Sequence, residues 1–393
     1  MASPEDKRVT NNNNFGATMK KNTPLSFHSC IKMTTLAAAI SGATYASAGI
    51  ELYNQDGTTF AADGLINTFY VHSKVDDQDN SLDRTQSRVK MGLLPNYIGF
   101  NAGKQMGDLK LGARSSFWVS INDANSNLTS TGIDVRQFYG TVDSDWGQVL
   151  IGKDFSLFNR SNIMSDEILL GYGQVASDGL VDGQGVSFGN IGAGYLYPFP
   201  NAQITYRTPD MNGLKLAVGL MDPSKSDSGS EESAPRLEAE LTYGANLTPD
   251  VPVKFWVSGM TQSSDNGSND IDSNGFAYGA NIKFSGLSLT ASGFTAEGVG
   301  AAGLSNLVTD KDADVDGWLV QASYSFGNER LVLSHGENSG GTTDGADNLD
   351  LENSTVAWFH SINSNLTLVA EYDRSQTDTR DTDSLALGAV LTW

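Results

Sequence analysis

Apolar and polar residues alternate along most of the chain beyond residue 49. Between 109 and 119 the odd positions are mainly apolar, as at Leu111 and Phe117, whereas the even positions include Lys110 and Arg114. Successive side chains of a strand point to opposite faces, so this pattern predicts strands with one apolar and one polar face. A soluble sandwich and a membrane barrel both satisfy it. The same alternation recurs at residues 237–243, 253–258, 276–284 and 366–373.

The spacing between these runs favours a barrel. Tight turns, such as Ser285-Gly286 and Asn363-Ser364, alternate with long acidic loops, and aromatic residues gather near the ends of the runs. Outer-membrane barrels show this asymmetry, with short turns at one end and long loops at the other. No apolar run reaches the ~18 residues of a membrane helix. We therefore predict an all-β transmembrane antiparallel barrel of about 16 strands, taking residues 86–104, around Pro95, as one long or broken strand.

Residues 154–200 are the one long interval that does not alternate. They are rich in glycine and acidic residues and contain SDEILLGY at 165–172, which has a helical pattern. Loops of this length inside a compact domain are uncommon and usually functional. We expect this third external loop to fold into the barrel lumen as a constriction loop.

The first 48 residues have the features of an N-terminal extension followed by a cleavable signal peptide. A basic segment begins at Met19-Lys20-Lys21, an apolar run covers 33–39, and Ala46-Ser47-Ala48 is a small-residue cleavage site. The barrel domain is therefore expected to span residues 49–393.

Removing residues 1–48 would take away five basic and two acidic side chains. The rest would hold 20 basic and 44 acidic side chains, a formal net charge of −24. Such a charge disfavours nucleic acid as a partner. The single cysteine, Cys30, would leave with the signal peptide, so no disulfide framework is expected.

Several segments resemble a known family. The start at residues 50–73, IELYNQDGTTFAADGLINTFYVHS, is similar to the opening of the enteric general porins. SRVKMGLLPNYIGF, RQFYGTVDSDWGQVLIGKD, NAQITYRTPDMNGL and AWFHSINSNLTLVAEY resemble successive hairpins of the Gram-negative trimeric porin superfamily. The chain departs from the enteric porins in lacking a Pro-Glu-Phe-Gly-Gly loop motif and in ending on Trp393 rather than Phe.

The resemblance implies a pore constriction in which arginines of the wall face acidic groups of the inserted loop. Alternation places Arg114 and Arg207 on the lumen side, and the resemblance places Arg88 and Arg136 there. Asp154 stands at the start of the loop. The predicted constriction residues are Arg88, Arg114, Arg136, Arg207, Asp166, Glu167, Asp178 and Asp182.

Two channel functions stay open at this point. One is a passive outer-membrane diffusion channel for ions and small hydrophilic solutes, and the other is a substrate-selective channel for small carboxylates. A surface receptor or adhesin is a third reading. An enzyme is disfavoured, because Ser334 and His335, like Ser361 and His360, are sequence neighbours and point to opposite faces of a strand.

The partners expected from this reading are outer-membrane lipid and lipopolysaccharide, and the resemblance implies a homotrimer. No metal site and no cofactor are predicted. The three histidines beyond residue 48, His72, His335 and His360, are scattered singly without the spacing of metal ligands.

Overall fold

The computed structural model describes residues 49–122, 132–182, 187–226, 228–268, 270–300, 313–341 and 350–393. The expected extension and signal peptide, residues 1–48, lie outside these ranges. Within them, no helix is both long enough and apolar enough to cross a membrane.

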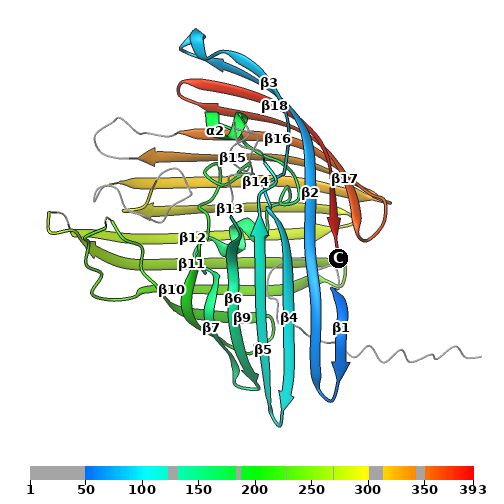
Figure 1. The fold of residues 1–393 in the computed structure, drawn as a ribbon, viewed down its shortest axis with the longest axis vertical. Coiled ribbons are helices and arrows are strands. Elements are labelled where there is room, and N and C mark those ends of the chain that lie inside the picture. The colour runs from blue at the N-terminus through cyan, green and yellow to red at the C-terminus, as the bar shows by residue number, and fades with distance from the viewer. Residues whose placement is uncertain are drawn as a thin grey trace, which may run out of the picture. The chain divides into compact units, whose positions relative to one another are not determined.

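The described residues are almost entirely strands (Figure 1). Three short helices interrupt them: η1 (Asn80–Leu82), α1 (Arg160–Met164) and α2 (Asp178–Val181). The strands are β1 (Ile50–Gln55), β2 (Thr58–Asp77), β3 (Arg84–Lys90), β4 (Asn96–Met106), β5 (Leu109–Val119), β6 (Asp134–Ser144), β7 (Gly147–Phe155), β8 (Pro200–Arg207), β9 (Leu214–Met221), β10 (Arg236–Thr248), β11 (Val251–Asp265), β12 (Asp270–Phe284), β13 (Leu287–Glu297), β14 (Asp314–Phe326), β15 (Glu329–Gly341), β16 (Leu351–Ser361), β17 (Leu366–Thr377) and β18 (Arg380–Thr392).

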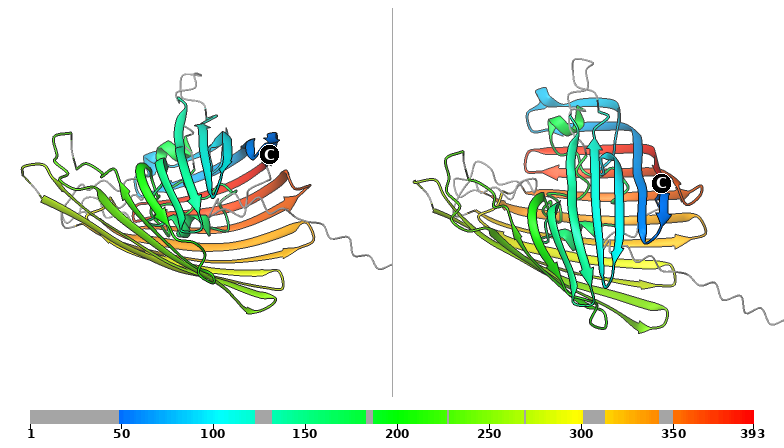
Figure 2. Two further views of the ribbon diagram at one scale, coloured as in Figure 1. Left: turned by 90° about the horizontal axis from the view of Figure 1, so that it is seen from below. Right: turned by 60° about the horizontal axis from the view of Figure 1, so that its bottom comes forward.

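These strands form a closed antiparallel barrel. Each strand from β4 to β18 pairs with the next one along the chain, and β2 closes the ring by pairing with β18 on one side and β4 on the other. Strands β2 and β4–β18 make up the sixteen strands of the barrel, while β1 and β3 are additional. Figure 2 shows β10–β18 side by side as one curved wall. The predicted fold and strand number are confirmed.

The region around Pro95, predicted to be one long or broken strand, is a broken strand. The first part of β2 pairs with β4, and its later part pairs with β3. Residues 91–95, between these two strands, belong to neither. Proline lacks the N–H that a ladder hydrogen bond requires, which explains why pairing stops here.

The apolar faces of the strands point outward, which distinguishes a membrane barrel from a soluble sandwich. On β10, Leu237, Leu241 and Tyr243 are 44%, 37% and 42% exposed, whereas Glu238 on the opposite face is fully buried. The exposed apolar side chains continue around the barrel, for example at Phe255, Val320, Val356 and Leu387. An exposed apolar band around a polar interior is the arrangement of a protein whose outer face contacts lipid.

The two ends of the barrel differ, as predicted. At one end β10–β11, β12–β13 and β14–β15 are joined by two-residue turns. Left-handed backbone at Ser285 (φ 49°), Gly286 (φ 87°) and Gly327 (φ 56°) closes two of them. At the other end the longest described connection, residues 156–199, joins β7 to β8. We call this connection the inserted loop. Its limits are slightly narrower than the predicted 154–200, since Asp154, Phe155 and Pro200 lie in strands.

The helical segment of the inserted loop is not where the pattern suggested. Residues 165–172 form turns, whereas α1 and α2 lie on either side of them. The reason is that the backbone N–H groups of Glu167, Tyr172 and Gly173 donate to side chains of the barrel wall. A regular helix through these residues would not present its backbone N–H groups sideways to the wall.

Candidate pore constriction

The inserted loop lies against the inner wall of the barrel and is held there through its own backbone. Glu238 on β10 accepts hydrogen bonds from the N–H groups of Leu157 (2.6 Å) and Phe158 (2.9 Å). Glu371 on β17 accepts from Tyr172 (3.0 Å) and Gly173 (2.6 Å). Further wall acceptors for loop N–H groups are Ser258 on β11, Gln321 on β14, Asn338 on β15 and Ser375 on β17. Because these acceptors belong to the inward face, the loop occupies part of the lumen.

Apolar side chains fill the space between the loop and this wall. Ile168, Tyr172 and Val175 of the loop pack with Phe69 on β2 and Phe359 on β16 in one buried cluster. Burial of this kind contributes roughly 25 cal/mol per Å² of apolar surface. The loop is therefore packed as a core element, and one side of the lumen is filled.

Asp166 is a buried loop anchor and does not face the lumen, contrary to its predicted role. It is 1% exposed and accepts hydrogen bonds from Tyr195 (2.5 Å), Gln321 on β14 (2.7 Å) and Asn190 (3.1 Å). Burial raises the pKa of its carboxyl above the ordinary value of 3.8, against the opposing effect of these hydrogen bonds. This burial could not be predicted from the sequence, because Tyr195, Gln321 and Asn190 come from distant positions.

Glu167, the next residue, is partly accessible and pairs with an arginine that was not predicted. Its carboxylate lies 3.2 Å from the Arg330 guanidinium on β15 and accepts from Ser288 (2.6 Å) and Ser323 (3.1 Å). Arg330 also stacks over Phe359, 4.0 Å from the ring centre. Alternation with Val332 and Ser334 on the same strand could have placed Arg330 on the inward face.

Asp182, near the end of α2, meets the start of β3. Its carboxylate accepts from Arg84 (3.3 Å) and Gln86 (3.2 Å). Arg88 lies on the same inward face, and its Nε is buried with no hydrogen-bond partner among the described residues. The side chain of Asp178, at the start of α2, lies outside what the structure describes.

Arg114 and Arg207 belong to a continuous polar network on strands β2 and β5–β8. Arg114 on β5 forms an ion pair with Asp63 on β2 (2.7 Å) and donates to Gln137 on β6 (2.7 Å). Gln137 in turn donates to Asp154 on β7 (2.9 Å).

Asp154 joins this wall network to the inserted loop. Its carboxylate lies 3.2 Å from Arg160 of the loop and 3.7 Å from Arg207 on β8. Asp154 and Arg207 thus lie together, whereas Arg160 was missed because acidic loop residues alone were considered.

Arg136 occupies a separate position, at the base of the inserted loop. It pairs with Asp134 (2.8 Å), donates to the Tyr197 hydroxyl (2.9 Å) and lies over Trp118, 5.1 Å from the ring centre. Aromatic faces attract guanidinium groups in this geometry. Arg136 therefore links β6 to the end of the loop.

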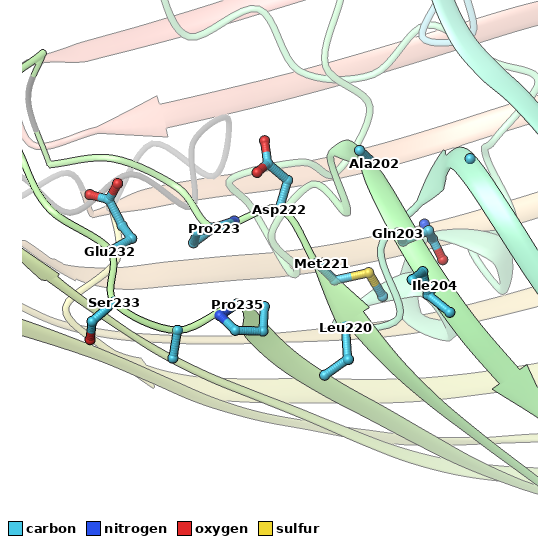
Figure 3. Close-up of a pocket in the computed structure, with 12 residues that line it drawn as sticks. Ala202, Gln203, Ile204, Leu220, Met221, Asp222, Pro223, Glu232, Ser233 and Pro235 are labelled. Carbon is cyan, nitrogen blue, oxygen red and sulfur yellow. The ribbon is translucent and has the colours of Figure 1, made fainter.

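A separate cavity of about 590 Å³ lies beside β8, β9 and residues 222–235 (Figure 3). Its lining includes Ile204 and Leu220 of the exposed apolar face, and also Gln203 and Met221, which are buried on the opposite face. Asp222 and Glu232 add carboxylates to its lining.

A closed barrel with an apolar outer face, a polar inner face and an inserted loop defines the class of membrane channel proteins. A family model described as Gram-negative porin matches residues 34–380. The chain belongs to this family, and it is an outer-membrane channel protein. No curated protein sequence matches it.

Solved structures of porins share the fold. The anion-selective porin from Comamonas acidovorans is 12% identical, with a TM-score of 0.63 over 86% of this chain and 100% of that one. The outer membrane channel DcaP of Acinetobacter baumannii is 16% identical, with a TM-score of 0.64 over 88% and 100%. OmpF of Salmonella typhi, solved with daunomycin, is 15% identical, with a TM-score of 0.60 over 88% and 100%.

Proposed function

We propose that this porin is a passive diffusion channel for ions and small hydrophilic solutes, narrowed by the inserted loop. The observation that carries the proposal is the attachment of loop backbone N–H groups to Glu238 and Glu371 on the inward face. A sixteen-stranded barrel is wide enough to leave an aqueous channel, so a loop fixed inside it sets the width.

Charges at the constriction are expected to determine ion preference. Among the described residues, Arg114 forms an ion pair with Asp63, and Arg160 and Arg207 form ion pairs with Asp154. Glu240 also interacts electrostatically with Arg160 and Arg207, so this wall carries charges of both signs in a chain whose overall net charge is −21. Fields in a narrow, partly buried site act on ions more strongly than exposed charges do.

A channel selective for small carboxylates is the second candidate. Arg160 and Arg207 share one carboxylate, and Arg88 has a buried Nε without a partner among the described residues. Guanidinium groups with few direct carboxylate partners suit an anionic solute. Assembly as a homotrimer, and contact of the apolar outer face with lipid and lipopolysaccharide, belong to the same proposal.

Planar-bilayer recording of the purified protein tests this function. Stepwise, ohmic conductance with a reversal potential in a salt gradient supports a channel. Addition of small dicarboxylates distinguishes the candidates, since only a selective site gives saturable current block at low solute concentration. Absence of conductance from a properly folded barrel contradicts both candidates.

A further inference from the structure

The five residues that break the second barrel strand, 91–95, fold into the lumen. We call them the inward segment. Met91 and Leu93 are only 0% and 4% exposed. In the strands before and after them, β3 and β4, the side chains of one face are exposed. A strand break leaves backbone groups without ladder partners, which is costly at membrane depth unless other groups satisfy them.

Asparagine side chains satisfy these backbone groups. Asn67 on β2 accepts from the N–H of Gly92 (2.6 Å) and donates to the carbonyl of Leu94 (2.7 Å). Asn122 accepts from the N–H of Met91 (2.8 Å). The side chain of Asn96 accepts from the N–H of Asn67 in turn (2.7 Å). The inward conformation is therefore specified by dedicated partners.

The inward segment contacts the inserted loop directly. The N–H of Leu93 donates to the carbonyl of Gly171 (3.1 Å). The Leu93 side chain packs on Gly189, where the backbone is left-handed (φ 58°) and any Cβ would overlap it. Gly92 likewise approaches the Gly171 carbonyl too closely for a larger residue. Glycine at these points permits the close approach of the two backbones.

One apolar cluster joins the inward segment, the inserted loop and strand β14 of the barrel wall. It contains Leu93, the loop residues Ile163, Leu169, Ile191 and Tyr195, and Leu319 on β14. The loop is thus held between β14 on one side and residues 91–95 on the other. Contact with the wall alone would leave the lumen-facing side of the loop unsupported.

We propose that the inward segment is a positioning element that holds the inserted loop against β14 and so fixes the width of the channel, with Leu93 and Asn67 as its positioning residues. This role rests on the proposed channel function, whereas the attachment itself can be measured without it.

The test compares Leu93→Ala with Leu150→Ala, a control at another buried leucine, on β7, outside this cluster. Hydrogen exchange of residues 163–171 and 189–195 should accelerate about tenfold or more in Leu93→Ala, because cavities of this kind usually cost more than the ~1.4 kcal/mol that equals a factor of ten. Single-channel recording should show added conductance levels. In the control Leu150→Ala, the hydrogen-exchange rates and the conductance levels should both stay at wild-type values. Leu93→Met should also give wild-type values, in contrast to Leu93→Ala.

A second variant acts from the loop side, in case Leu93→Ala does not fold. Gly189→Ala adds a Cβ against Leu93 without altering any strand, and it should accelerate exchange in the same loop residues. Unchanged loop exchange in both variants would overturn the positioning role. If the wild-type protein conducts no ions, the channel function fails, and the exchange experiment still decides whether residues 91–95 hold the loop.

Discussion

The Oε1 atom of Glu371, in the middle of β17, accepts a hydrogen bond from the backbone N–H of Gly173 at 2.6 Å. Glu371 is 1% exposed, and its side chain interacts with that of Asp373 on the same face of the strand. An inward carboxylate on a barrel strand would normally be hydrated. Here it is committed to holding the middle of the inserted loop.

Replacing this carboxylate should release the loop. Glu371→Leu removes the acceptor for two backbone N–H groups, and each buried group left unsatisfied costs about 1–3 kcal/mol. We expect faster hydrogen exchange at residues 168–175 and a noisier open channel. Glu371→Gln keeps one acceptor oxygen and is the matched control. Equal exchange in the two variants would show that Glu371 does not anchor the loop.

The two faces of one strand should respond differently to charge. Leu241, in the middle of β10, is 37% exposed on the outer face, and Thr242 follows it on the inner face. Leu241→Arg should destabilise the barrel by about 2–4 kcal/mol, because the lipid side offers no water near the bilayer midplane. Thr242→Arg should be nearly neutral. Urea unfolding in lipid vesicles measures both, and equal cost at the two sites would contradict the orientation of the sheet.

Neutralising opposite charges of the wall network should shift ion preference in opposite directions. Arg207→Gln removes a positive charge beside Asp154 and should raise the cation-to-anion permeability ratio, whereas Asp154→Asn should lower it. Changes of about twofold are expected at low salt, where screening extends over ~10 Å at 0.1 M. Reversal potentials give the ratio. A shift in the same direction for both variants would show that neither charge faces the ion path.

Loop attachment should depend on pH through Asp166. Burial raises the pKa of this carboxyl above 3.8, so the attached loop binds its proton more tightly than the released loop does. Between the raised pKa and 3.8, the loop should therefore be attached more strongly as the pH falls. It should be attached more weakly as the pH rises through the same interval.

Hydrogen exchange of residues 189–195, corrected for the intrinsic rate at each pH, measures this dependence. Asp166→Asn removes the titrating group and should abolish the pH dependence over that interval. Persistence of the full dependence in this variant would assign it to another group.

Barrel topology could be predicted from the sequence because each strand carries its own evidence. Alternation places Leu241 and Arg114 on their faces without knowledge of any other strand. The break at Pro95 could be predicted for the same reason, since proline acts locally.

The interior could not be predicted so well, because it depends on contacts between distant residues. Asp166 looks like an exposed loop acid until Tyr195 and Gln321 are placed around it. Glu238 looks like a hydrated lumen residue, yet it is fully buried, pairs with Arg236 (2.8 Å) and accepts two loop N–H groups. Its replacement should therefore disturb the loop, contrary to what alternation suggests.

The central claim is that the inserted loop narrows the channel, and single-channel conductance of a shortened loop tests it most directly. Gly173 and Gly189 lie side by side in an isolated bridge, so a short Gly-Ser link can replace residues 176–187 and span the same gap. The account predicts a clear rise in conductance with the barrel intact. Unchanged conductance in a folded, shortened protein would contradict it.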